Sequence, residues 1–120
     1  MRILIVDDSK AMRMIVMRTL RQAGFGAHTL EEAADGKQAL SAIQLSTPDL
    51  VLSDWNMPEM LGIELLQALR AAGNSVRFGF VTSEGTEDMK AKAMAAGALF
   101  IIVKPFTPEQ FKAELGPLLG

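Results

Sequence analysis

The sequence predicts an α/β fold: a doubly wound (βα)5 three-layer sandwich around a five-stranded parallel sheet. Four short runs, residues 3–6, 50–52, 78–81 and 100–103, are hydrophobic at nearly every position. Strands that are covered on both faces have this pattern. Segments with helical spacing separate the runs, so strand and helix alternate along the chain. Successive βα units of this kind predict right-handed crossovers and one sandwich.

The composition is that of one folded domain, expected to span residues 1–120 without an output domain. Of the 120 residues, 49% are hydrophobic and 22% are charged, which excludes a disordered chain. The net charge of -2 provides no basic field for nucleic acid or a membrane surface. There is no cysteine, which excludes disulfides and thiolate metal sites. The first apolar run is too short for a signal peptide, so we expect a soluble, cytoplasmic protein.

The elements of the first half follow from caps and breakers. After the first strand, apolar residues recur at helical spacing from Ser9, a capping residue, to Gly24, which ends the helix. Residues 27–31 are a weaker strand candidate. Asp35 and Gln38 have the spacing of a capping box, and the helix that they open is expected to end near residues 46–48.

The second half repeats the alternation. Residues 56–58 break regular structure after the third strand, and a helix then continues to Gly73. A further helix is expected over about residues 86–96. Thr107, Pro108 and Gln110 open the last helix with a cap, a proline at the first helical position and a partner three residues after the cap. We expect residues 116–117, Gly-Pro, to cut this helix short.

Polar residues close, or directly follow, four of the predicted strands: Asp7-Asp8, Asp54, Thr82 and Lys104. Parallel strands place their carboxyl ends at one edge of the sheet, where ligands bind in open α/β folds. Two of these carboxylates about 4 Å apart would repel by roughly 4 kcal/mol at an effective dielectric near 20. Lys104 supplies one compensating charge, and Mg²⁺, which prefers oxygen ligands, supplies two more.

A half-open magnesium site beside a lysine and a hydroxyl is suited to phosphoryl chemistry. A carboxylate can accept a phosphoryl group covalently when a metal and a cation screen the incoming charge. Asp54 is the best placed for this chemistry because it ends the central strand. The residues alone therefore favour formation of an aspartyl phosphate on Asp54.

Four motifs carry a resemblance to a known family: residues 6–9 (Val-Asp-Asp-Ser), 54–58 (Asp-Trp-Asn-Met-Pro), 81–84 (Val-Thr-Ser-Glu) and 103–107 (Val-Lys-Pro-Phe-Thr). In this order and spacing the chain resembles the receiver domain of two-component response regulators, especially the stand-alone chemotaxis type. The resemblance covers essentially the full length. It implies the flavodoxin-like strand order 2-1-3-4-5 and a cis Lys104-Pro105 bond.

The resemblance also implies a role for each acidic residue. Asp54 would be the phosphoacceptor and a ligand of Mg²⁺. Asp8 would bind the metal directly and Asp7 through water, and the backbone carbonyl of Asn56 would be a further protein ligand.

Lys104 would pair with the phosphoryl group, and Thr82 would donate its hydroxyl to a phosphoryl oxygen and draw the following loop inward. A histidine kinase or phosphotransfer protein would be the phosphoryl donor. The helix over 86–96, the strand over 100–103 and the last helix would form the face that binds a downstream target. The chain would catalyse only its own phosphorylation and dephosphorylation.

One position departs from the family pattern. Receivers commonly carry an aromatic residue three positions before the lysine, where this chain has Ile101. The neighbouring aromatic, Phe100, should face the opposite side of the sheet because successive strand side chains alternate. The sequence leaves open whether an aromatic switch operates in this chain.

The sequence is also compatible with three other functions. A magnesium phosphohydrolase would use Asp54 as a turnover nucleophile, but Asn56 stands where such enzymes place an acid-base aspartate. A flavin or nucleotide binder would need a phosphate loop after the first strand, where Asp7-Asp8 would repel the phosphate. An unphosphorylated docking module would not need the complete polar set. Individually, the same residues are also common as turn or helix caps.

Overall fold

The computed structural model describes residues 1–119 and contains one parallel sheet with the strand order β2-β1-β3-β4-β5. The strands are β1 (Arg2–Val6), β2 (Thr29–Ala33), β3 (Leu50–Ser53), β4 (Arg77–Thr82) and β5 (Phe100–Val103). The helices are α1 (Lys10–Leu20), α2 (Gly36–Leu45), α3 (Gly62–Ala71), α4 (Glu87–Ala95) and α5 (Pro108–Leu119), with a π-helical turn, η1 (Arg21–Phe25), after α1. The predicted fold class and strand order are confirmed.

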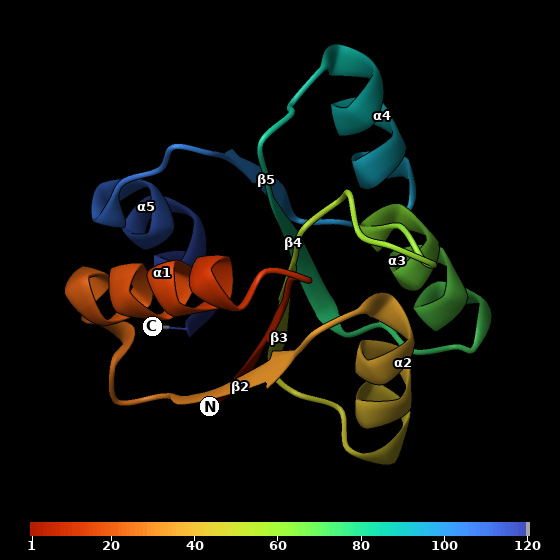
Figure 1. Ribbon diagram of the computed structural model, residues 1–120, viewed down its shortest axis with the longest axis horizontal. Coiled ribbons are helices and arrows are strands. Elements are labelled where there is room, and N and C mark those ends of the chain that lie inside the picture. Colours follow the sequence, from red (N-terminus) through yellow and green to blue (C-terminus); the bar gives the residue numbers. More distant parts are fainter. Residues whose placement is uncertain (120) are drawn as a thin grey trace.

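The sheet is the middle layer of a three-layer sandwich, with α1 and α5 on one face and α2, α3 and α4 on the other (Figure 1). Each face carries its own hydrophobic core. On the α1/α5 side, Ile3, Ile5 and Phe111 are fully buried, and on the other side Phe78, Phe80 and Leu66 are. Adjacent residues of each strand therefore enter opposite cores, as continuous apolar runs require.

Side-chain caps position the helices. Ser9 accepts the Met12 N–H and Asp35 accepts the Gln38 N–H, so α1 and α2 begin at their expected caps. Helix α4 also begins near its expected start, and its cap is Thr86, which accepts the Met89 N–H. Gly24 lies in η1 with φ 97° and takes the chain out of the helical conformation. Within the described residues, no helix is long and apolar enough to cross a bilayer.

Two elements differ from the sequence prediction. Strand β2 begins and ends two residues later than the expected 27–31, because pairing with β1 places Thr29 opposite Arg2 and Ala33 opposite Val6, and the Thr29 N–H bonds to the Met1 carbonyl. Helix α5 continues past Pro117 to Leu119, which corrects the expectation that it stops at Gly116. Burial of Leu119 and the bond from Arg77 Nη1 to the Leu118 carbonyl, 2.8 Å, hold this last turn.

Gly79 and Phe100 lie side by side in β4 and β5, paired in register. A Cβ atom on Gly79 would collide with the Phe100 ring, which lies over the glycine and is itself buried. Glycine in the middle of a strand marks such a close approach. The ring of Phe100 thus fills the space that a side chain at position 79 would occupy.

Candidate functional site

The carboxyl ends of β1 and β3 bring three carboxylates together. Asp7 and Asp8 follow β1 directly, and Asp54 follows β3, where its N–H bonds to the Val6 carbonyl at 2.9 Å. One oxygen from each carboxylate lies within 4.8 Å of the others. Asp7 is buried, Asp54 is half-buried and Asp8 is exposed. The cluster therefore opens to solvent on the side of Asp8.

Lys104 supplies the positive charge that the sequence predicted. Its Nζ atom lies 3.4 Å from Asp7 Oδ2 and 3.6 Å from Asp54 Oδ2, and its side chain is only 15% exposed. The backbone N–H of Lys104 bonds to the Thr82 carbonyl at 2.8 Å, so the end of β4 holds the start of the loop that follows β5. The Lys104-Pro105 bond is cis, as the resemblance implied.

Among the described residues, the side chains of Thr82 and Asn56 form no hydrogen bond with Asp7, Asp8, Asp54 or Lys104. Thr82 ends β4 fully buried, and its hydroxyl oxygen accepts the Glu84 N–H at 3.4 Å, a long contact. Asn56 is exposed in the loop that follows Asp54. The structure therefore brings together Asp7, Asp8, Asp54 and Lys104, and the roles of Thr82 and Asn56 stay predictions.

The donor set fits Mg²⁺. The three carboxylates supply one oxygen each, and Mg²⁺ prefers oxygen ligands at about 2.1 Å, which places adjacent ligands of an octahedron roughly 3.0 Å apart and opposite ones roughly 4.2 Å apart. The three oxygens all lie within 4.8 Å of one another, so they can share one ion once they draw closer or one of them binds through a water. The exposed side of the cluster leaves room for the waters that Mg²⁺ keeps.

Gly62 packs against the backbone carbonyl of Asp54, a contact that no sequence pattern indicated. A Cβ atom at position 62 would collide with the Asp54 carbonyl oxygen and would lie 3.0 Å from Phe80 Cε1. The Gly62 N–H donates to the Trp55 carbonyl at 2.8 Å, which joins the start of α3 to the residue after Asp54. Only a residue without a side chain permits this approach.

Arg13 is a second residue of the site that the sequence analysis missed. From α1, its Nη1 donates to the Asp7 carbonyl at 2.7 Å and its Nε pairs with Glu32 Oε1 at 2.9 Å. An arginine four residues after a helix cap gives no sequence signal for such a contact. It becomes visible only when β1, β2 and α1 are placed together.

Burial raises the pKa of the Asp54 carboxyl above its ordinary value. Lys104 acts in the opposite direction, the charge on Asp7 raises the pKa further, and the N–H of Trp55, 2.7 Å from Asp54 Oδ1, lowers it. The net upward shift means that folding disfavours the charged form of Asp54 in the metal-free protein.

We expect Asp54→Asn to raise the melting temperature of the metal-free protein at about pH 7 but not at about pH 4. A raised pKa means that the folded state binds more protons, so the stability of the parent protein falls as pH rises between the ordinary and raised values. Asparagine does not titrate and escapes this loss. Thermal unfolding in a chelator at both pH values measures the difference. A gain that is equal at both values would contradict the assignment.

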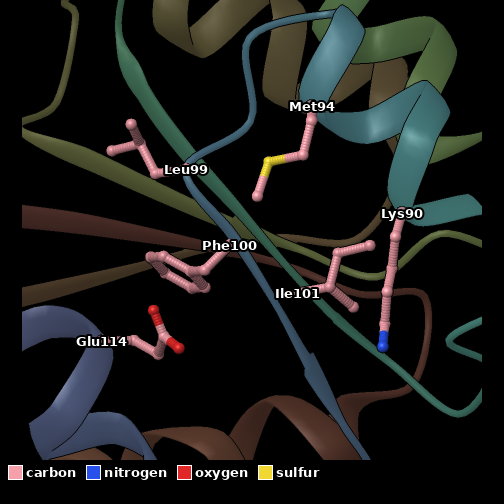
Figure 2. A pocket seen from close by; sticks show the side chains of 6 residues that line it. All are labelled: Lys90, Met94, Leu99, Phe100, Ile101 and Glu114. Atoms are coloured by element: carbon pink, nitrogen blue, oxygen red, sulfur yellow. The ribbon is translucent and has the colours of Figure 1, made fainter.

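A groove lies between α4, β5 and α5, along the first half of β5. Its volume is about 320 Å³, and it is lined by Lys90, Met94, Leu99, Phe100, Ile101 and Glu114. Figure 2 shows Phe100 and Ile101 on opposite sides of β5, with Phe100 toward the helix that carries Glu114 and Ile101 toward α4. The prediction that Phe100 faces the opposite side of the sheet from position 101 is confirmed.

Comparisons with known proteins agree with this architecture. The family described as "Response regulator receiver domain" matches residues 3–116. Chemotaxis protein CheY of Pseudomonas aeruginosa is 40% identical over 117 residues, covering 96% of this chain and 93% of that protein. Chemotaxis protein CheY-3 of Vibrio cholerae is 41% identical over 117 residues, covering 96% and 88%. The solved structure of chemotaxis protein CheY4 of Vibrio cholerae superimposes with a TM-score of 0.85 at 37% identity, covering 98% of each chain.

Proposed function

This chain belongs to the response regulator receiver domain family, and from that premise we propose that it is a phosphoacceptor switch of a two-component chemotaxis pathway, phosphorylated on Asp54. The observation that carries the proposal is the convergence of Asp7, Asp8 and Asp54 with the Lys104 ammonium at one sheet edge. The phosphoryl donor would be a histidine kinase or a phosphotransfer protein.

In the proposed reaction, a carboxylate oxygen of Asp54 attacks the phosphorus of a phosphohistidine. The O–P bond forms as the N–P bond breaks, and the departing imidazole nitrogen keeps the bonding electrons and takes a proton from solvent. Lys104, already beside Asp54 Oδ2, pairs with the incoming phosphoryl oxygens. Buried Thr82 would turn its hydroxyl toward one of these oxygens after transfer.

Asp8, Asp7, Asp54 and the carbonyl of Asn56 would hold Mg²⁺. When bound, the ion supplies two positive charges that offset the repulsion between the carboxylates and the phosphoryl group. The fit of the oxygen donors to Mg²⁺ supports this assignment, and the same ion would assist autodephosphorylation, the only other reaction that we propose for the chain.

The output would be a shift in population. A phosphoryl group on Asp54 adds charge beside Lys104 and Thr82, and it favours whichever arrangement of the β4–α4 loop binds that charge better. The loop leads into α4, and α4 forms one wall of the groove between α4, β5 and α5 (Figure 2). We propose that the downstream target, a protein, binds this face.

The decisive test is the mass of the intact protein after incubation with acetyl phosphate. We expect an adduct of one phosphoryl group with Mg²⁺ and none with a chelator, because the carboxylates then repel the donor. Neutral hydroxylamine should remove the adduct, since it cleaves acyl phosphates but not phosphate esters of serine or threonine. An absent or hydroxylamine-resistant adduct would contradict the proposal.

The phosphohydrolase alternative is not favoured by the comparisons, whose curated relatives are chemotaxis regulators. Asn56 has no titratable group for acid-base catalysis. Steady hydrolysis of p-nitrophenyl phosphate over many turnovers would reverse this conclusion.

A further inference from the structure

The carboxylates of Asp7 and Asp8 are held in different ways. Asp7 Oδ1 accepts the Ser9 N–H at 2.9 Å, and Asp7 Oδ2 lies 3.4 Å from Lys104 Nζ. Asp8 is exposed, and no hydrogen bond or ion pair holds its carboxylate within residues 1–119. The direction of the Asp8 side chain therefore depends on its backbone.

The backbone at this point is the peptide unit that joins Asp7 to Asp8, and Arg13 fixes its orientation. The Asp7 N–H is still in the sheet and bonds to the Ala33 carbonyl at 3.2 Å. The Asp7 carbonyl lies beyond the end of β1 and accepts instead from Arg13 Nη1 at 2.7 Å. Rotation of this peptide plane would move the Cα–Cβ bond of Asp8 and swing its carboxylate away from Asp54.

Glu32 in turn holds Arg13. The ion pair between Arg13 Nε and Glu32 Oε1 is 2.9 Å long, and the arginine side chain is only 13% exposed. The planar guanidinium donates to a carbonyl and a carboxylate at once, which the single ammonium of a lysine does less well. The contacts thus connect β2 through α1 to the end of β1.

We propose that Arg13 is a positioning residue for the cation site, setting the Asp7–Asp8 peptide plane so that the Asp8 carboxylate faces Asp54. The inference rests on the proposed function, because it concerns the Mg²⁺ that the site would bind. Residues that orient metal ligands typically contribute ten- to a hundredfold in affinity. We therefore expect Arg13→Met to weaken Mg²⁺ binding by about tenfold or more.

Whether Arg13→Met weakens or tightens Mg²⁺ binding distinguishes a positioning role from a purely electrostatic one. Arg13 is a cation close to an acidic cluster, so its charge alone opposes the binding of Mg²⁺, and its removal would tighten binding. A purely structural contribution to folding would leave the affinity of the folded protein unchanged. Only a positioning role predicts weaker binding.

Isothermal titration calorimetry with MgCl₂ measures the affinity, and urea unfolding monitors stability in parallel. Arg18→Met is the matched control, because Arg18 lies in the last turn of the same helix and is exposed. We expect it to bind Mg²⁺ within twofold of the parent protein. Arg13→Lys should restore part of the affinity, and Glu32→Gln, which keeps the arginine, should lose less than Arg13→Met.

A double-mutant cycle with Asp8→Asn tests the route of the effect. If Arg13 acts through Asp8, Arg13→Met should cost less than about twofold further affinity in the Asp8→Asn background. Unchanged or tighter binding by Arg13→Met, or an equal loss in both backgrounds, would overturn the inference. If Arg13→Met does not fold, Arg13→Lys and Glu32→Gln test the inference instead. Both should bind Mg²⁺ more weakly than the parent protein, and unchanged or tighter binding by both would overturn the inference. Absence of Mg²⁺ binding by the parent protein would instead contradict the proposed function.

Discussion

Asp54→Asn is expected to abolish the phosphoryl adduct, reducing its yield with acetyl phosphate and Mg²⁺ from a major species to an undetectable one. The amide has the shape of the carboxylate, and its oxygen can still accept the Trp55 N–H that holds Asp54 Oδ1 at 2.7 Å. It lacks the negative oxygen that attacks phosphorus, however, and it removes one charge from the cation site. The loss should therefore be chemical and not structural.

Intact mass spectrometry measures this loss, and Asp88→Asn provides the matched control. Asp88 lies exposed in the first turn of α4, away from the carboxylate cluster, and its replacement should affect only a favourable interaction with the helix dipole. An adduct of normal yield on Asp54→Asn would move the phosphoacceptor to another residue. We also expect metal-free Asp54→Asn to be more stable than the parent protein at neutral pH. If Asp54→Asn is more stable and forms no adduct, the Asp54 carboxylate lowers stability in exchange for reactivity.

Gly62→Ala is expected to destabilise the protein by about 3 kcal/mol and to reduce the adduct on Asp54. The added methyl group collides with the carbonyl oxygen of Asp54, a backbone atom at the end of the central strand. Relief requires a shift of either α3 or Asp54, because a carbonyl cannot rotate away as a flexible side chain can. Either movement alters the separation of the three carboxylates.

Urea unfolding measures the stability change, and Gly26→Ala is the comparison. Gly26 has φ -68°, and its added Cβ would meet nothing closer than Arg21 Cγ at 3.5 Å. This substitution should be neutral or stabilising by up to about 1 kcal/mol, because alanine restricts the unfolded chain. A loss below about 0.5 kcal/mol for Gly62→Ala would show that the loop after β3 yields more easily than its packing indicates.

Much of the fold follows from local signals in the sequence. The continuous apolar runs identify β1, β3, β4 and β5, and the capping residues Ser9, Asp35 and Thr107 identify three helix starts. The limits of β2 do not follow, because its two glutamates and its edge position give weak strand propensity, and pairing with β1 fixes its start. The end of α5 was missed because buried Leu119 outweighs the helix-breaking tendency of Gly116-Pro117.

The candidate site divides in the same way. The convergence of Asp7, Asp8, Asp54 and Lys104 follows from strand ends that share one edge, which sequence order alone indicates. The contacts of Gly62 and Arg13 depend on how α3 and α1 pack against the ends of β3 and β1. No local pattern encodes such distances, so these supporting residues are identified only in three dimensions.

Gly79 and Phe100 show how this sheet constrains the divergence of its own sequence. Because the ring occupies the space above the glycine, a larger residue at 79 is tolerable only once 100 has become small, and a small residue at 100 leaves a void until 79 grows. Each single step costs stability that the second step restores. Among homologues, we therefore expect positions 79 and 100 to covary, with a small residue at one and a large residue at the other. Two large or two small residues at these positions should be rare.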